Sequence, residues 1–167
     1  VARMQAAMVD ALRKAWEARD PDLPINSEQE LLTLASIVER ETGRSDERAT
    51  VAGVFVNRLK RGMKLQSDPT TIYAVTNGKG PLSRGLRRSE LSLEHPYNTY
   101  HIAGLPPGPI ANPGKAALQA AARPAETDAL FFVADGTGGH AFTRTLAEHN
   151  RNVARWREVE RSRNAAE

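Results

Sequence analysis

The segment from Ser27 to Thr42 constrains the fold most strongly, because it combines a helix start signal with an apolar run. Ser27 and Glu30 have the spacing of a capping box, in which each side chain satisfies a backbone amide that the first helical turn leaves unpaired. The apolar run follows at once, and Gly43 ends it. This pattern predicts a helix over residues 28–42.

Apolar residues recur at helical spacing before and after this segment. The further helices that they predict span residues 4–19, 45–61, 68–75 and 112–122. Thr145 and Glu148 repeat the capping box ahead of a final helix.

Two short runs are strand-like, residues 130–134 and 140–143. The glycine-rich segment 135–139 joins them and is typical of a hairpin, because glycine permits positive φ. Between residues 76 and 113, many Gly and Pro residues predict a long irregular loop, which in a compact domain is often functional. The expected fold class is therefore α+β, a mainly helical domain with a small antiparallel β-sheet.

Composition excludes several classes of function. The chain has 167 residues, enough for one compact domain with a single core. It has no cysteine, which rules out thiol catalysis, thiolate metal sites and disulfides. It has no Gly-rich phosphate loop, dinucleotide fingerprint or Gly-x-Ser-x-Gly elbow, which argues against nucleotide-dependent enzymes and serine hydrolases. The histidines lack metal-ligand spacing, so we expect no metal and no other cofactor.

Charge and hydropathy limit the classes of partner that the chain is expected to bind. The net charge is +3, with basic and acidic residues interleaved, whereas a nucleic-acid footprint is usually more concentrated. The basic stretch Lys79–Arg88 fits either a solvated loop or a site for an anionic polymer, and we expect no nucleic-acid partner. No run of about 18 apolar residues occurs, and the start, Val1–Met8, has no signal core. This chain by itself is expected to be soluble.

Glu39 is the carboxylate that helical projection favours as a general acid. It lies within roughly 40° of Leu32 and Ala35, on the mostly apolar face of the predicted helix. Loss of hydration there would raise its pKa and let it donate a proton near neutral pH. Glu30 and Glu41 project to the opposite side and are expected to be ordinary solvent carboxylates. A structural glutamate paired with a buried Arg or with backbone amides is the alternative for Glu39.

Polar and aromatic residues cluster in two later segments. Residues 66–70 collect amide, hydroxyl and carboxylate groups at a predicted helix start, where they fit either capping or a polar ligand. Residues 97–100 place two tyrosines next to the stiff segment 104–110, a combination that suits sugars, although half-buried packing explains the tyrosines equally well. His140 fits a proton carrier, a metal ligand or a hydrogen-bonding residue at the rim of a site.

Taken together, several blocks resemble the endolytic murein transglycosylase family, also called YceG-like. They are LASIVERET (34–42), VFVNRL (54–59), LQSDPT (65–70), YNTY (97–100), GLPPGPI (104–110), FFVAD (131–135) and GHAF (139–142). The likeness runs in order from about residue 27 to 150. It implies a connecting helix and linker over residues 1–26 and a lysozyme-like catalytic domain over residues 27–167.

The resemblance also implies an activity and its residues. The family cuts within nascent glycan strands of peptidoglycan beside the peptidoglycan synthases (penicillin-binding proteins). Its catalytic glutamate maps onto Glu39. The matching blocks imply the following substrate-binding residues: Ser36, Gln66, Ser67, Asp68, Tyr97, Asn98, Tyr100 and His140. The family also carries an N-terminal transmembrane helix and a LysM-like segment, so we expect an excised catalytic domain of a single-pass inner-membrane protein that acts on the periplasmic side.

One glutamate is sufficient for the reaction that this family performs. Protonated Glu39 would donate to the oxygen that leaves C1 of N-acetylmuramic acid, and would then take the proton of the C6 hydroxyl, which closes a 1,6-anhydro ring. A hydrolytic muramidase would need a second carboxylate, for which Asp68 is the candidate. A non-catalytic peptidoglycan-binding module is the other alternative.

Overall fold

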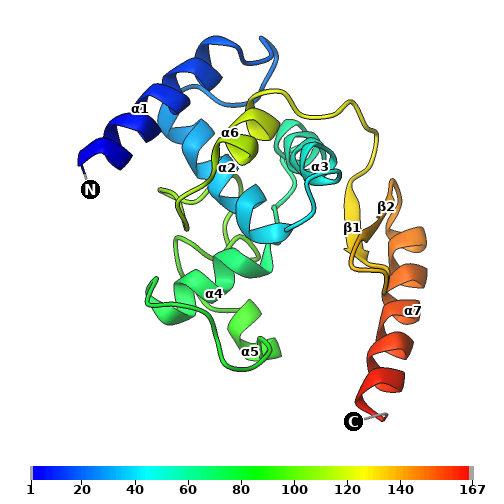
Figure 1. Ribbon diagram of the computed structural model, residues 1–167. Coiled ribbons are helices and arrows are strands. Elements are labelled where there is room, and N and C mark those ends of the chain that lie inside the picture. The colour runs from blue at the N-terminus through cyan, green and yellow to red at the C-terminus, as the bar shows by residue number, and fades with distance from the viewer. Residues whose placement is uncertain (1, 166–167) are drawn as a thin grey trace.

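The computed structural model describes residues 2–165, and within them lie seven helices and one β-hairpin, with α2 at the centre of the helical body (Figure 1). The elements are α1 (Ala2–Glu17), α2 (Glu28–Glu41), α3 (Arg48–Lys60), α4 (Asp68–Thr76), α5 (Arg88–Leu91), α6 (Lys115–Ala122), β1 (Phe131–Ala134), β2 (His140–Thr143) and α7 (Leu146–Asn164). The α+β class is confirmed, and the predicted helices and strands all occur with shifts of a few residues at their ends.

Helix α2 begins at the predicted cap with one change of partner. The Ser27 hydroxyl accepts a hydrogen bond from the Glu30 amide at 3.2 Å. The Glu30 carboxylate, however, accepts from the amide of Asn26 at 2.6 Å. Both groups thus satisfy backbone donors at the start of α2, as a capping box does. At the start of α7, Thr145 accepts from the Glu148 amide in the same way.

The core is built around α2, which neighbouring helices enclose on nearly every side. Residues Leu31 to Val38 are buried except for Leu32. Helix α6 lies along α2 with an alanine-rich face, in which Ala117 and Ala121 have no exposed surface. Small side chains let the two helices approach closely, so the middle of α2 has no face turned to solvent.

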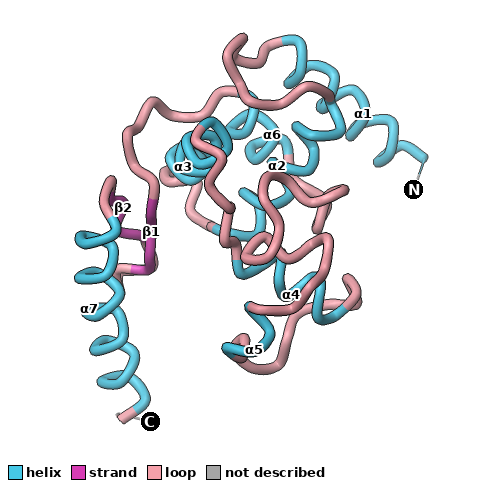
Figure 2. Tube along the Cα trace, turned by 180° about the vertical axis from the view of Figure 1, so that it is seen from behind, coloured by secondary structure: helices cyan, strands magenta, loops and turns pink. Residues whose placement is uncertain are grey.

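The hairpin and α7 form an arm at one side of the helical body (Figures 1 and 2). β1 and β2 are antiparallel, with Phe131 opposite Thr143 and Ala134 opposite His140. Phe132 of β1 packs edge-on against Phe55 of α3, with 5.8 Å between the ring centroids. This contact attaches the arm to the core, and α7 packs on the outer side of the hairpin.

The long segment between α4 and α6 is irregular, as predicted, apart from the short helix α5, which the sequence does not predict. Within it, Arg84 of the basic stretch pairs with Glu90 through two contacts of 2.9 and 2.6 Å. The stretch is exposed for most of its length. The basic stretch is therefore a solvated loop, and Glu90 balances the charge of one of its arginines, Arg84.

Helix α1 packs on the same body, although the sequence predicts only a connecting helix there. Ala15 and Ile25 belong to the buried core. The Asp20 amide donates to the carbonyl of Ala122 at 2.9 Å, which ties the end of α1 to α6. The division at residue 26 stays a prediction. Within residues 2–165, no helix is both long and apolar enough to cross a bilayer.

Gly53 of α3 marks a close contact that can be tested. A Cβ atom there would lie 2.6 Å from the carbonyl oxygen of Ala125 and 2.9 Å from Cγ2 of Thr127. Alanine in a helix interior normally gains about 1 kcal/mol over glycine, but overpacking costs about 1–3 kcal/mol. We therefore expect Gly53→Ala to lower the free energy of unfolding, measured in urea, by up to about 2 kcal/mol.

The matched control for this prediction is Gly43→Ala. Gly43 has no atom within 4 Å of an added Cβ. We expect that variant to be neutral or slightly stabilising, because alanine restricts the unfolded chain. Equal effects of the two substitutions would contradict the close contact at Gly53.

Candidate active site

The last turn of α2 carries two glutamates to opposite sides of the helix, because residues two apart are separated by roughly 200°. Glu39 faces the loop before α6, and Glu41 faces the loop before α4 and the β-hairpin. The carboxylates of Glu39 and Glu41 therefore have different hydrogen-bond partners and different surroundings.

Glu39 joins the end of α2 to the start of α6. Its Oε2 accepts a hydrogen bond of 2.9 Å from the amide of Gly114, the N-cap residue of α6. One turn earlier, the fully buried Ser36 donates to the Thr33 carbonyl and accepts from the Ile110 amide. This side of α2 holds the loop before α6, so the structure gives Glu39 and Ser36 backbone partners.

Glu41 was predicted to be an ordinary solvent carboxylate, and this is wrong. Its Oε1 accepts a hydrogen bond of 2.5 Å from the hydroxyl of Ser67, which is itself buried. Burial raises the pKa of Glu41 to about 7; the Ser67 hydrogen bond opposes the shift, and the negative charge of Asp68 adds to it. A carboxyl group in this state holds a proton close to neutral pH, which is the property required of a general acid.

The loop that presents Ser67 to Glu41 is held rigidly by the buried Arg58. The Arg58 guanidinium donates to the carbonyls of Leu130, Lys64 and Leu65 at 2.7, 2.9 and 3.2 Å. It thereby ties α3 to this loop and to the residue before β1. Gln66 takes a positive φ of 51° in this loop, and its amide donates to the Thr99 carbonyl.

Asp68 and Tyr100 stand beside Glu41. The Tyr100 hydroxyl donates to Oδ1 of Asp68 at 2.6 Å. Burial, followed by this hydrogen bond to a carboxylate, raises the pKa of Tyr100 above its ordinary value. The tyrosine therefore stays a neutral donor, and its hydrogen bond fixes the Asp68 carboxylate, whose charge acts on Glu41.

These groups line an open cleft of about 620 Å³ between the helical body and the arm. On the body side lie Glu41, Gln66, Asp68 and Tyr100, and the hairpin side includes His140. Residues of α7, among them His149 and Arg157, complete the lining. The cleft has the size and the mix of apolar walls and polar groups that suit a sugar chain.

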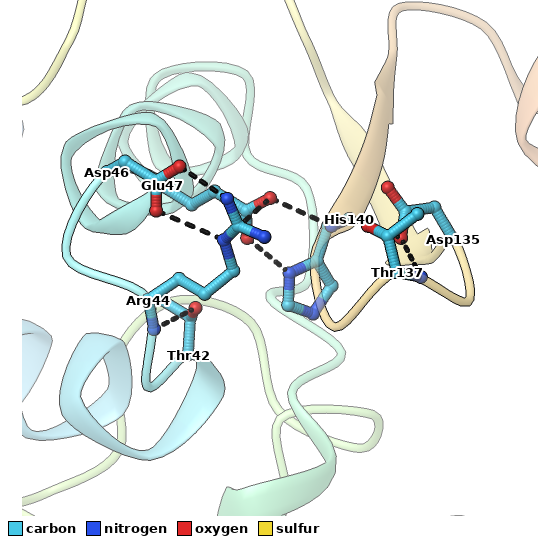
Figure 3. A network of polar contacts seen from close by, with 7 residues as sticks. All are labelled: Thr42, Arg44, Asp46, Glu47, Asp135, Thr137 and His140. Atoms are coloured by element: carbon cyan, nitrogen blue, oxygen red, sulfur yellow. Dashed lines mark hydrogen bonds and ion pairs between the residues drawn. The ribbon is translucent and has the colours of Figure 1, made fainter.

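His140 is fixed by Glu47, the residue before α3. The Glu47 carboxylate lies 2.8 Å from Nδ1 of His140 and accepts from the His140 amide at 2.9 Å (Figure 3). Arg44 lies 3.9 Å from the same carboxylate and pairs with Asp46 at 2.6 Å. This network joins the hairpin to the start of α3 at the edge of the cleft.

The remaining predicted residues lie away from this cleft. Asn98 is fully buried; its amide nitrogen donates to the carbonyls of Leu91 and Leu93, and its Oδ1 accepts from Thr71. Tyr97 is half-buried and packs against Tyr73, with 4.7 Å between the ring centroids. The observed contacts of Asn98 and Tyr97 are packing contacts and hydrogen bonds within the protein.

Of the predicted residues, the structure thus gathers Gln66, Ser67, Asp68, Tyr100 and His140 around Glu41, which the sequence predicts to be an ordinary solvent carboxylate. Within the described chain, no three His, Asp or Glu side chains are placed to share a metal ion. The chemistry that the described side chains themselves offer is proton donation and acceptance by Glu41, in a cleft where Asp68 supplies a nearby negative charge.

Comparisons with known proteins agree on one family. The model of the YceG-like family matches residues 1–155. An endolytic murein transglycosylase of Bacillus subtilis is 46% identical over 125 residues, which are 75% of this chain and 34% of the relative. One of Streptococcus pneumoniae serotype 2 (strain D39) is 37% identical over 158 residues, 90% of this chain and 27% of the relative. A solved yceG-like protein of Listeria monocytogenes superposes with a TM-score of 0.67 at 41% identity, covering 75% of this chain and 39% of that one. The chain spans about a third or less of the length of these curated relatives.

Proposed function

This chain belongs to the YceG-like family, and we propose that it cleaves glycan strands of peptidoglycan internally by a lytic transglycosylase reaction. The observation that supports this most directly is the Glu41 carboxyl group, with a pKa of about 7, in an open cleft of about 620 Å³ that polar side chains line. The names of the relatives supply the substrate, murein, and the mode of cleavage.

In the proposed mechanism, Glu41 acts first as acid and then as base. Protonated Glu41 donates its proton to the glycosidic oxygen that leaves C1 of N-acetylmuramic acid, and positive charge develops at C1. The Glu41 carboxylate then accepts the proton of the C6 hydroxyl of the same sugar, and O6 bonds to C1. The products are a free hydroxyl on the departing strand and a 1,6-anhydromuramoyl end, without consumption of water.

Asp68 is assigned an electrostatic role in this mechanism. Its negative charge favours the protonated form of Glu41 before bond cleavage. During cleavage the same charge stabilises the positive charge that develops at C1. The hydrogen bond from Tyr100 holds Asp68 in place. A hydrolase would instead use Asp68 to activate water, and the products distinguish the two reactions.

The cellular setting is also a proposal. Murein lies outside the cytoplasmic membrane, where peptidoglycan synthases build it. We therefore place the action of the whole protein on nascent strands beside those synthases. Anchoring in the cytoplasmic membrane would be provided by a segment other than residues 2–165, in which no helix can cross a bilayer.

The experiment that tests the reaction is mass spectrometry of fragments released from uncrosslinked glycan strands by the purified chain. We expect fragments that end in 1,6-anhydromuramic acid. Fragments with reducing ends would contradict a transglycosylase and assign hydrolysis with Asp68 as the second carboxylate. Binding of strands without any release would contradict catalysis and assign a binding module.

A further inference from the structure

His140 is held by a carboxylate that takes no part in the proposed proton transfers. Both oxygens of Glu47 are engaged, Oε1 by the His140 amide at 2.9 Å and Oε2 by the ring nitrogen Nδ1 at 2.8 Å. The two side chains are largely enclosed, with exposed fractions of 17% for His140 and 14% for Glu47. Such a two-point contact fixes both the backbone and the ring of His140.

The local chain is shaped to allow this contact. A Cβ atom on Gly139 would lie 2.6 Å from Oε1 of Glu47 and 3.3 Å from Nη1 of Arg44. Only glycine therefore lets the hairpin approach the carboxylate so closely. Arg44 lies 3.9 Å from the Glu47 carboxylate and places a positive charge beside it.

The contact determines which ring nitrogen carries the proton. A carboxylate only accepts hydrogen bonds, so Nδ1 must be the donor, and in a neutral imidazole the other nitrogen, Nε2, then has a free lone pair. Figure 3 shows the second ring nitrogen on the side away from Glu47. His140 lines the cleft, and no side chain or backbone group of residues 2–165 hydrogen-bonds to Nε2.

We propose that Glu47 is a positioning residue, which fixes His140 with its proton on Nδ1 so that Nε2 accepts a hydrogen bond from the glycan. The donors that fit are a sugar hydroxyl or the N–H of an N-acetyl group, both of which murein sugars carry. This inference rests on the proposed glycan substrate. The role of Glu47 itself is independent of whether the bond is cleaved.

The test is nitrogen-15 NMR of the His140 ring at a pH where histidine is neutral, in a Glu41→Gln background that does not turn over substrate. The shifts of the two ring nitrogens report which one carries the proton. We expect the proton on Nδ1, and we expect the Nε2 signal to move when an uncrosslinked tetrasaccharide of alternating N-acetylglucosamine and N-acetylmuramic acid is added. A proton on Nε2, or an Nε2 signal that the tetrasaccharide leaves unchanged while it binds, would overturn the inference.

Glu47→Gln is the informative variant, because a carboxamide keeps an acceptor for the His140 amide but offers an N–H to Nδ1. We expect the ring proton to move to Nε2 and the KM of the Glu41-containing chain to rise about tenfold, with kcat changed far less. Asp46→Asn is the matched control, since it removes a neighbouring carboxylate that pairs only with Arg44. A purely structural role would instead change the melting temperature and leave the ring proton in place.

The NMR readout also separates this inference from the proposed function. A chain that binds the tetrasaccharide through Nε2 but releases no fragments would contradict the transglycosylase reaction and leave the role of Glu47 intact. A chain that releases anhydromuramoyl fragments with the ring proton on Nε2 would contradict the role of Glu47 alone.

Discussion

Replacing Glu41 with glutamine is expected to slow the release of anhydromuramoyl fragments by about 10²- to 10⁴-fold, the usual contribution of a positioned acid and base. Glutamine keeps the size of the side chain and an oxygen that can accept from Ser67, as the carboxylate does. It has no proton to give to the leaving oxygen and cannot take one from the C6 hydroxyl. Initial rates on uncrosslinked strands, followed by mass spectrometry, measure the effect.

Glu39→Gln is the control for this prediction, because it makes the same chemical change two residues earlier. A glutamine oxygen at position 39 can still accept from the Gly114 amide, which is the contact that the structure shows. We therefore expect a loss of less than about tenfold. The helical projection and the family resemblance both make the reverse prediction, with Glu39 as the acid. Loss of activity in Glu39→Gln together with a fully active Glu41→Gln would instead assign the role of acid to Glu39.

The choice between these glutamates shows where local sequence patterns stop being informative. Projection identifies the acid only if the helix has one buried face, and α2 is buried nearly all round. Ala35, on the side of Glu39, and Ile37, on the side of Glu41, are equally devoid of exposed surface. The position of Glu41 four residues after Ile37 was as strong a signal as the one that favoured Glu39. Glu39 and Glu41 differ only in the residues from other segments of the chain that contact them.

Contacts within a few residues account for the parts of the fold that the sequence predicts. The start of α2, the hairpin and the start of α7 depend on residues within a few positions of one another, and all three were predicted from capping and turn patterns. The site depends on contacts over long separations. Arg58 meets Leu130 across 72 residues, and Glu47 meets His140 across 93. No local pattern marks either residue, so both were missed, although VFVNRL, one of the family blocks, contains Arg58.

The raised pKa of Glu41 also predicts how the stability of the fold depends on pH. In the folded chain the pKa of this group is about 7, against an ordinary value of 4.5. Between these values the folded state binds more protons than the unfolded state, so the contribution of Glu41 to stability is fully present below pH 4.5 and is lost as the pH rises to about 7. A shift of this size corresponds to a loss of at most about 3 kcal/mol. Glutamine cannot ionise and avoids that loss.

Glu41→Gln should therefore become progressively more stable than the unmodified chain between pH 4.5 and 7, by at most about 3 kcal/mol at pH 8, when urea unfolding is compared at each pH. Glu90→Gln provides a control of opposite sign. The hydrogen bonds from Arg84 and from the Arg87 amide lower the pKa of Glu90 to about 2, so its stabilising contribution is present above pH 4.5 and is lost as the pH falls towards 2. That variant should be less stable than the unmodified chain at neutral pH and should approach it in acid. A stability difference for Glu41→Gln that does not change with pH would show that Glu41 ionises at its ordinary value, and would remove the main physical reason for assigning it the role of acid.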